Sequence, residues 1–152
     1  MTTITICSSV NFYRQVIDIA EQLESEGYDV IVPKTALKMK ESGDFDADHH
    51  RTWLADPNDY DKKAALMRAH FVEIEKGDVI LIVNNEKRGV PNYIGGNVLM
   101  EMALAFYLKK PIFLLNDIPT ESPFLEEIIG VGSVPLHGKI EDLTTAYQDL
   151  VK

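Results

Sequence analysis

The sequence predicts a single α/β domain, a doubly wound parallel sheet of about five strands with helices on both faces. Short apolar runs alternate with longer segments of helical periodicity along the whole chain. The run at 78–83, DVILIV, is apolar on both faces, as a central parallel strand should be. The length of 152 residues and the 45% hydrophobic content suit one domain over residues 1–152.

The first third of the chain predicts a complete βαβ unit. An apolar run closes in Ser8 and Ser9, and apolar residues then recur at helical spacing. Gly27 ends this helix and Pro33 closes the next strand. The predicted elements are a strand over 4–7, a helix over 13–23 and a strand over 29–33. Residues 34–59 are polar and irregular, so we expect a long loop or a partly helical lid there.

The remaining elements continue the alternation of helix and strand. They are a helix over 61–77, a strand over 78–83, a helix over 97–108, a strand over 111–115, a short helix ending at 129, an edge strand over 134–136 and a helix over 140–151. Ser122 and Pro123 resemble the N-cap and the first residue of the short helix. Leu143, Tyr147 and Leu150 are expected to face inward from the last one.

Glu101 is the only charged residue in the run at 97–108, NVLMEMALAFYL. The run follows Gly95 and Gly96 and is apolar around its whole circumference, which predicts a buried helix that begins at a glycine turn. Burying a carboxylate is costly unless it is paired, and the helix N-terminus should supply part of the compensation. Such a carboxylate could be a nucleophile or a base, or it could cap backbone groups or pair with a lysine.

The composition excludes several classes of function. The net charge of −9 argues against binding to a nucleic-acid backbone, so a small molecule is the expected ligand. Cys7 is the only cysteine, which excludes an intrachain disulfide, and packing is its expected role. His49 and His50 are adjacent but lack a third positioned ligand, so no metal site is predicted. We expect no signal peptide, no membrane span and a cytoplasmic location.

Three loops, at 7–12, 84–96 and 116–120, should meet at the carboxyl edge of the sheet, where ligands bind in such folds. Ser8 and Ser9 could hold a phosphate ahead of a helix N-terminus, although an ordinary N-cap is the alternative. The loops match neither a Walker A motif nor a GxGxxG fingerprint. The candidate substrate-binding residues are Ser8, Ser9, Phe12, Asn84, Tyr93, Gly95, Gly96, Asn97 and Asn116.

Four strings carry a resemblance to a known family: ICSS before a helix, EKGDVILIVN, YIGGNVLMEMALAF and KKPIFLLN. Over nearly the whole chain, the sequence resembles the nucleoside 2-deoxyribosyltransferase-like family, which includes 2′-deoxynucleoside 5′-phosphate N-hydrolases. The likeness extends to small members that share the NYIGGN run. It implies cleavage or transfer at the N-glycosidic bond of a (deoxy)nucleoside or its 5′-monophosphate, with Glu101 as the nucleophile and no cofactor.

The resemblance also assigns roles to other residues. His70 stands where family members commonly have an aspartate, so either His70 protonates the leaving base, or an acid from residues 44–61 does, or catalysis is weak or lost. A histidine on the helix surface or in packing is the other interpretation. Ser8 and Ser9 would hold the 5′-phosphate. The chain would form a homo-oligomer, a dimer or higher, with Asn116 reaching into a neighbouring subunit.

Other functions remain open at this point. A non-catalytic nucleotide-binding or sensing module would keep the fold and lose the chemistry. A phosphoribohydrolase of the cytokinin-activating type also has a glycine pair ahead of a helical glutamate, but its PGGxGT run is missing, because Asn97 and Val98 follow Gly96 here. A redox flavoprotein is compatible with the fold class, since fold alone does not fix function.

Overall fold

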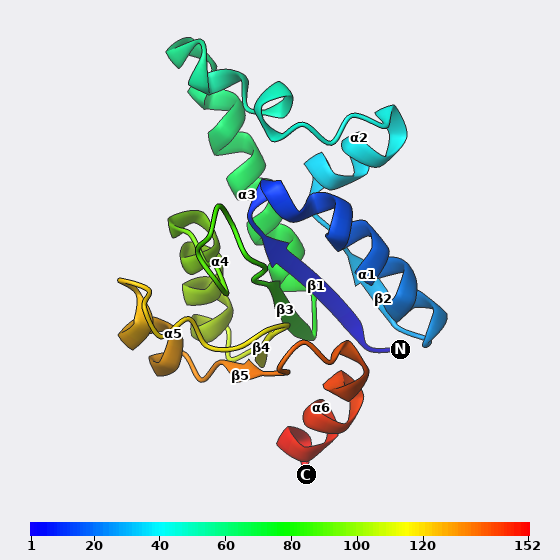
Figure 1. Ribbon diagram of the computed structural model, residues 1–152. Coiled ribbons are helices and arrows are strands. Elements are labelled where there is room, and N and C mark those ends of the chain that lie inside the picture. Colours follow the sequence, from blue (N-terminus) through cyan, green and yellow to red (C-terminus); the bar gives the residue numbers. More distant parts are fainter.

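The computed structural model describes residues 1–152 and contains one five-stranded sheet in the order β2-β1-β3-β4-β5 (Figure 1). All neighbouring strands pair in parallel. The strands are β1 (Thr3–Ser8), β2 (Asp29–Ile31), β3 (Val79–Val83), β4 (Ile112–Leu114) and β5 (Val134–Pro135). Parallel neighbours need crossover connections, which helices supply. The predicted doubly wound α/β fold is therefore confirmed.

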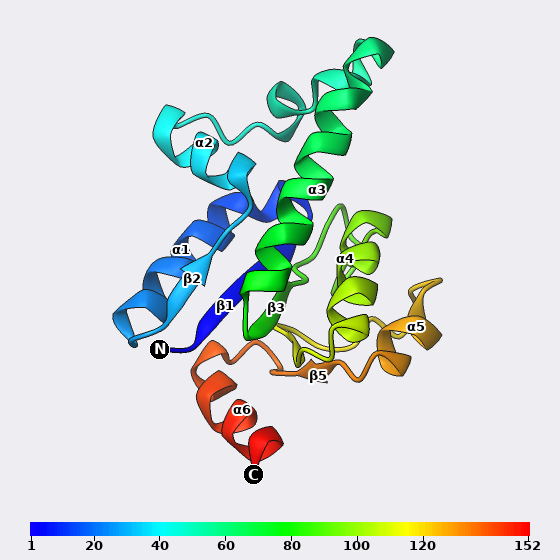
Figure 2. The ribbon, with the colours of Figure 1, turned by 180° about the vertical axis from the view of Figure 1, so that it is seen from behind.

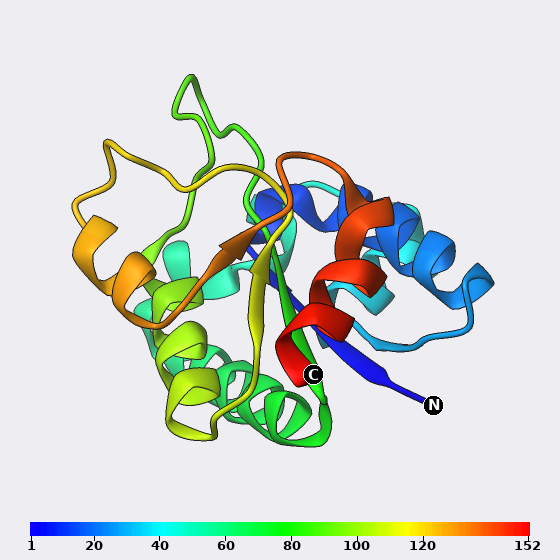
Figure 3. The same cartoon turned by 90° about the horizontal axis from the view of Figure 1, so that it is seen from below.

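Helices cover both faces of the sheet (Figure 3). They are α1 (Tyr13–Ser25), α2 (Lys34–Ser42), α3 (Tyr60–Lys76), α4 (Gly96–Tyr107), α5 (Leu125–Gly130) and α6 (Leu143–Val151). Buried residues of α1 and α6 pack with Ile4 and Ile6 of β1 in one core cluster. Residues of α3, α4 and α5 pack with Cys7, Ile80 and Ile82 in the other. Each strand thus sends alternate side chains to opposite cores.

The alternation along β1 determines which side chains face α3. Ile4 and Ile6 point toward α1, so Thr5 and Cys7 point toward α3 on the other side of the sheet. The Thr5 hydroxyl donates a 2.8 Å hydrogen bond to the backbone carbonyl of Glu73, and Cys7 contacts His70. This strand therefore fixes the position of α3 through two polar contacts inside an apolar layer.

The segment 34–59 is partly helical rather than a loop. It contains α2 and three short 3-10 turns, at Ala47–His50, Thr52–Leu54 and Pro57–Asp59. Trp53 is buried, and the Arg14 guanidinium lies 4.3 Å from the centre of the Phe45 ring. Together with the first turns of α3, this segment extends beyond the carboxyl ends of the strands, at the top of Figure 1. It therefore brings side chains over the edge of the sheet where ligands bind.

Helix α4 is buried on one side only, which corrects the prediction of burial all round. Its buried residues are Val98, Glu101, Met102 and Ala105. Their spacing of three and four positions defines a single face, and that face packs against the sheet. Met100, Phe106 and Tyr107 are exposed on the rest of the helix. Figure 2 shows α4 beside α3.

Two details near the C-terminus also differ from the sequence prediction. Helix α5 begins at Leu125, with Phe124 as its N-cap, because the Ser122 hydroxyl instead accepts a 3.0 Å hydrogen bond from the Phe124 amide in a preceding turn. Leu143 is buried as predicted, but Leu150 is exposed, since the last turn of α6 extends past the core. No helix combines the length and the apolar character needed to cross a membrane.

The junction between α3 and β3 gives a stability prediction. A Cβ at Gly77 would overlap Thr5 Oγ1 and lie 3.3 Å from the Thr5 backbone nitrogen. We expect Gly77→Ala to lower the free energy of unfolding by about 1–3 kcal/mol, the usual range for overpacking, as measured by urea denaturation. Gly130→Ala is the control, because a Cβ there meets no atom within 4 Å. Equal stability of the two variants would contradict the packing argument.

Candidate functional site

A pocket opens at the carboxyl ends of β1 and β3. In the order β2-β1-β3-β4-β5, the chain turns in opposite directions from these two strands, so their carboxyl ends form the topological switch point where doubly wound folds bind ligands. The pocket is lined by residues of the loops after β1 and β3, by α3 and α4, and by the segment 34–53. Five separate parts of the chain therefore contribute to one cavity.

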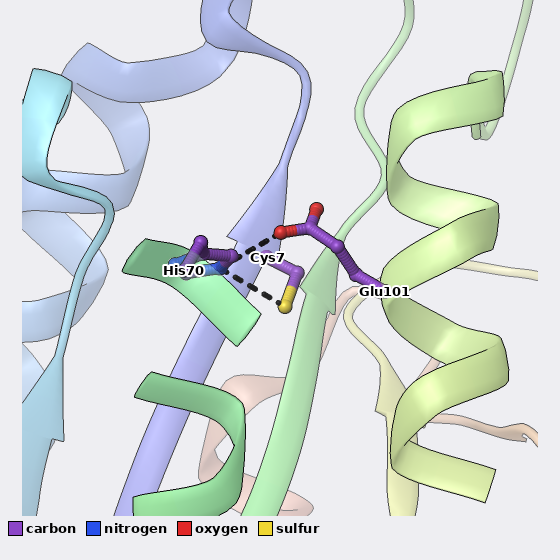
Figure 4. Close-up of side chains that lie close together, drawn as sticks. All are labelled: Cys7, His70 and Glu101. Carbon is purple, nitrogen blue, oxygen red and sulfur yellow. Dashed lines mark hydrogen bonds and ion pairs between the residues drawn. The ribbon is translucent and has the colours of Figure 1, made fainter. Parts of the chain in front are cut away.

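Three side chains from different elements converge at the buried end of this region (Figure 4). Glu101 extends from α4, His70 from α3 and Cys7 from β1. His70 Nε2 lies 3.1 Å from Glu101 Oε2 and 3.3 Å from Cys7 Sγ. Glu101 is 4% exposed, His70 8% and Cys7 0%. The lone charge of the apolar helix thus has a buried partner, which explains how its burial is tolerated.

A second carboxylate holds the other side of the His70 ring. Glu73 lies one helical turn further along α3, and its Oε2 is 2.9 Å from His70 Nδ1. The imidazole therefore lies between Glu73 and Glu101, with each ring nitrogen facing a carboxylate oxygen. The contact with Glu73 is a hydrogen bond, and the contact with Glu101 is an ion pair when the ring is protonated. Glu73 fixes the ring orientation, and the bond from Thr5 fixes the backbone of Glu73.

Asn97 binds the remaining carboxylate oxygen of Glu101 and is itself bonded to Lys63. Asn97 Nδ2 donates a 3.3 Å hydrogen bond to Glu101 Oε1, and Lys63 Nζ donates a 3.1 Å hydrogen bond to Asn97 Oδ1. The Lys63 ammonium also lies 5.6 Å from the centre of the Trp53 ring. Both carboxylate oxygens of Glu101 consequently have a partner, and the carboxylate is oriented from two sides.

The electrostatics of Glu101 follow from its burial. Burial raises its pKa to about 7, although the positive charges of His70 and Lys63 act in the opposite direction. Glu101 lies five positions after Gly96, the first residue of α4. The helix dipole acts mainly within the first turn, so its expected contribution is small. His70, Lys63 and Asn97 supply the compensation that the sequence argument assigned to the helix N-terminus.

The pKa values of His70 and Cys7 are also shifted. Burial alone would lower the pKa of His70, but the hydrogen bond to Glu73 and the negative charge of Glu101 outweigh it and raise the pKa. Burial, then Glu101 and Glu73, raise the pKa of the Cys7 thiol. A neutral, fully buried thiol is a poor nucleophile, which argues against a cysteine hydrolase despite the Cys7, His70 and Glu73 alignment.

Basic side chains surround the rest of the pocket. Lys34, His50, Arg51, Lys63 and Lys87 all line it, although the protein as a whole carries a net charge of −9. Their gathering favours an anionic ligand, because a cleft lined by one sign of charge concentrates the opposite sign. The buried carboxylates and the basic lining together define a pocket with two electrostatically distinct parts.

A tight hairpin turn places one of these lysines. Lys87 and Val90 form an isolated antiparallel bridge, and the two residues between them, Arg88 and Gly89, have φ values of 49° and 81°. Positive φ at both central residues is the signature of a type I′ turn. The Lys87 ammonium then lies 4.7 Å from the centre of the Tyr93 ring. The glycine-containing loop after β3 is thus an ordered wall of the pocket.

Most of the residues predicted for the site line this pocket. They are Ser8, Ser9, His70, Tyr93, Gly95, Gly96, Asn97 and Glu101. Ser9 is the N-cap residue of the 3-10 turn Val10–Phe12, but its hydroxyl makes no cap bond and donates instead to Asn11 Oδ1 at 3.1 Å. The Ser8 hydroxyl donates to the Ser9 carbonyl oxygen at 3.0 Å.

Three predicted residues do not line the pocket. Phe12 is buried in the core beside α1. Asn84 and Asn116 join the ends of β3 and β4: Asn84 Oδ1 accepts a 2.9 Å bond from the Asn116 amide, and Asn116 Nδ2 donates to Asn85 Oδ1 at 2.9 Å. The side-chain amide of Asn116 is thus bonded within its own chain. These asparagines connect adjacent loops at the carboxyl ends of β3 and β4.

The fold also places at the site several residues that are absent from the sequence prediction. Glu73 had a usable signal, because it follows His70 by three positions on a helix. Tyr13, Lys63, Arg51 and Trp53 had none, since they line the pocket only through the tertiary arrangement. The pKa of the Tyr13 phenol is raised by burial, and by the charge of Glu101, so the phenol stays a neutral hydrogen-bond donor.

Comparison with known proteins found no matching family model and no matching curated protein. Inference about function therefore starts from the pocket, from the carboxylate held inside it and from the resemblance of the sequence strings.

Proposed function

We propose that this protein cleaves or transfers at the N-glycosidic bond of a (deoxy)nucleoside 5′-monophosphate. The observation that carries the proposal is the Glu101 carboxylate, buried in a pocket and held through both oxygens by His70 and Asn97. A carboxylate held in this way suits attack on an anomeric carbon. The resemblance to the nucleoside 2-deoxyribosyltransferase-like family supports the same assignment.

In the first step, a Glu101 oxygen would attack C1′ of the sugar. The bond from C1′ to the base nitrogen breaks, its electron pair moves to the base, and a glycosyl ester forms on Glu101 through an oxocarbenium-like transition state. His70 would give its Nε2 proton to the departing base. For this it must exchange its contact with Glu101 for one with the base, a change that substrate entry between them would bring about.

In the second step, water or a second base would attack C1′ and release Glu101. With water, His70 accepts a proton from the water and the sugar phosphate is the product. With a base, His70 accepts the proton that the attacking nitrogen loses, and a new nucleoside monophosphate forms. The aspartates of residues 44–61 do not line the pocket, so none of them is placed to replace His70. Among the alternatives for the leaving-group acid, the geometry favours His70.

The 5′-phosphate would bind among the basic side chains. Lys34 and Arg51 line the same pocket as Ser8 and Ser9, together with His50, so an anionic group held by the serine loop would have cations nearby. A neutral nucleoside would offer these cations no anionic group. This distribution of charge favours a nucleotide over a nucleoside.

A specific observation favours a second candidate, a nucleotide-binding or sensing module without turnover. His70 occupies the place of the family's aspartate and forms a short contact with Glu101, so both groups are engaged with each other. If nucleotide binding does not open this pair, the pocket binds its ligand without chemistry. Affinity would then be insensitive to His70→Ala.

The two candidates are separated by incubating the protein with a panel of ribo- and deoxyribonucleoside 5′-monophosphates and measuring released base by chromatography. Release from particular nucleotides establishes the glycosidase and identifies the substrate. Absence of release, together with a thermal shift on nucleotide addition, establishes the binding module. Absence of both release and binding rejects the two candidates together.

The bond from Asn97 gives a prediction about positioning. We expect Asn97→Ala to lower kcat by about tenfold, a loss near 1.4 kcal/mol, with KM nearly unchanged, because Glu101 Oε1 loses its donor while the pocket stays intact. Asn58→Ala, on the exposed surface, should have no effect. Steady-state kinetics of base release would measure both. A rise in KM with kcat unchanged would instead assign Asn97 to substrate binding.

We also propose that the chain assembles as a homo-oligomer, a dimer or higher. The large exposed side chains Met100, Phe106 and Tyr107 on α4 support this, since contact with a second chain would remove them from water. Asn116, the residue expected to reach into a neighbouring subunit, is bonded to Asn85 within its own chain. The mass in solution, determined by light scattering, tests this proposal.

A further inference from the structure

We propose that Cys7, His70 and Glu101 form a binding site for a divalent transition-metal ion, with Zn²⁺ as the best match to the donor set. The thiolate, the imidazole and the carboxylate are the three ligand types that zinc binds in proteins. A metal at this position would share Glu101 with the proposed glycosidase reaction. Binding of the ion rests on the geometry of the three side chains alone; its inhibitory effect rests on the proposed function.

The distances between the donor atoms suit a metal. Zinc bonds to nitrogen, oxygen and sulfur measure about 2.0–2.3 Å, which in a tetrahedron separates neighbouring ligand atoms by about 3.3–3.8 Å. Cys7 Sγ and His70 Nε2 lie 3.3 Å apart, and His70 Nε2 and Glu101 Oε2 lie 3.1 Å apart. The three ligand atoms all fall within 4.8 Å of one another. Two of the three separations therefore lie within a few tenths of an ångström of the values in a tetrahedral shell, and the third is at most 4.8 Å.

The partner that a metal-binding histidine needs is already present. Metal-bound histidines usually direct their second ring nitrogen to a carboxylate or a carbonyl group, which fixes the ring and its tautomer. Glu73 Oε2 lies 2.9 Å from His70 Nδ1 and leaves Nε2 directed at Cys7 and Glu101. Asn97 does the same for Glu101 by holding Oε1, so that Oε2 faces His70.

The charge balance also favours a cation. The carboxylates of Glu73 and Glu101 and the thiol of Cys7 surround a single imidazole, that of His70, so the cluster can carry more negative than positive charge. A divalent ion would offset that excess. On binding, Cys7 loses its thiol proton, and any proton held between His70 and Glu101 is also released to the buffer.

The fourth coordination position would face the pocket. His70 and Glu101 line the cavity, whereas Cys7 lies beneath them with no exposed surface. A water molecule or an anionic group of the ligand could fill the open position, as in zinc sites that are not fully enclosed by protein. Because Glu101 Oε2 becomes a metal ligand, the ion blocks the attack on C1′, and metal binding and base release exclude each other.

Cobalt(II) provides the test, because it substitutes for zinc and is coloured. A thiolate bound to Co²⁺ gives a charge-transfer band in the near ultraviolet, and Cys7 is the only cysteine in the chain. Titration of the full chain with Co²⁺ should produce this band, saturating at one ion per chain, and Zn²⁺ should remove it by displacement. A band can only come from Cys7, so its absence overturns the proposal.

Variants locate the ion. Cys7→Ser and Cys7→Ala should abolish the band and weaken Zn²⁺ binding in calorimetry by at least about the 10–100-fold that loss of an outer partner costs. The matched control is His49→Ala, which removes a histidine from the exposed cluster of Asp44 and Asp46. The band and the Zn²⁺ affinity should survive this change. Zn²⁺ binding lost in His49→Ala and kept in both Cys7 variants would overturn the site.

The outcome is independent of the proposed reaction. A Co²⁺ band in a protein that, when metal-free, releases no base from any nucleotide would establish the metal site and reject the glycosidase. Base release without a Co²⁺ band would establish the glycosidase and reject the metal site. Circular dichroism of each variant confirms that it is folded, and Glu101→Gln should keep the thiolate band with weaker Zn²⁺ binding, since one of the three ligands is lost.

Discussion

Glu101→Gln is expected to abolish base release, with a fall in kcat of at least about a thousandfold, or ~4 kcal/mol in transition-state stabilisation. Glutamine keeps the size of the side chain and can still accept the bond from Asn97, but it has neither the charge nor the nucleophilic oxygen of a carboxylate. Single-turnover measurement of released base provides the test. The same experiment should show no covalent glycosyl adduct by mass spectrometry.

The fold should tolerate this substitution, because it replaces a buried group that is costly to ionise with a neutral one of similar shape. The urea midpoint of Glu101→Gln is therefore expected to equal or exceed that of the unmodified protein. Glu75→Gln, an exposed change on α3, serves as the activity control. Full base release by folded Glu101→Gln would show that the nucleophile lies elsewhere.

His70→Ala is expected to lower kcat by about 10²–10⁴-fold, the usual contribution of a general acid. The reason is that the base then departs without a proton from Nε2 of His70. A role as general acid also predicts a result that a purely structural role of His70 does not. A nucleotide with an N7-methylated purine carries a positive base that leaves as a neutral molecule, so it needs no acid. After spontaneous hydrolysis is subtracted, its cleavage should be nearly insensitive to His70→Ala.

Two comparisons complete that experiment. Glu101→Gln should remain inactive on the methylated substrate, because it lacks the nucleophile rather than the acid. Glu73→Gln should show a smaller loss than His70→Ala on ordinary nucleotides, since the ring is present but less well oriented. An equal loss in His70→Ala on both substrates would mean that His70 positions Glu101 and that another group protonates the base.

The strands and most of the helices could be predicted from local pattern. The run at 79–83 is apolar at every position because β3 is covered by helices on both faces, and all five of its residues are buried. The ends of elements were less predictable. Ser122 and Pro123 satisfy the statistics of a helix start, yet Ser122 forms a turn instead, since a serine hydroxyl can serve either structure.

The exposed side of α4 could not be predicted either. Periodicity tells how apolar a helix is around its axis, but it does not tell which sides other elements cover. Glu101 is the only charged residue in the run at 97–108, so the pattern predicted burial on all sides of the helix. In the structure, the sheet covers one face, and Phe106 and Tyr107 are exposed on another.

The sequence by itself determined the α/β fold and identified Glu101 as the exceptional residue, because a lone charge in an apolar helix is visible without any neighbour. Only the tertiary structure decided what surrounds it. Cys7, His70 and Glu101 are far apart in the chain and meet because β1, α3 and α4 pack together. Their chemistry depends on distances of 3.1–3.3 Å, which no spacing along the chain encodes. The partners that shift the pKa of Glu101, and with them the proposed reaction and the proposed metal site, follow from that packing.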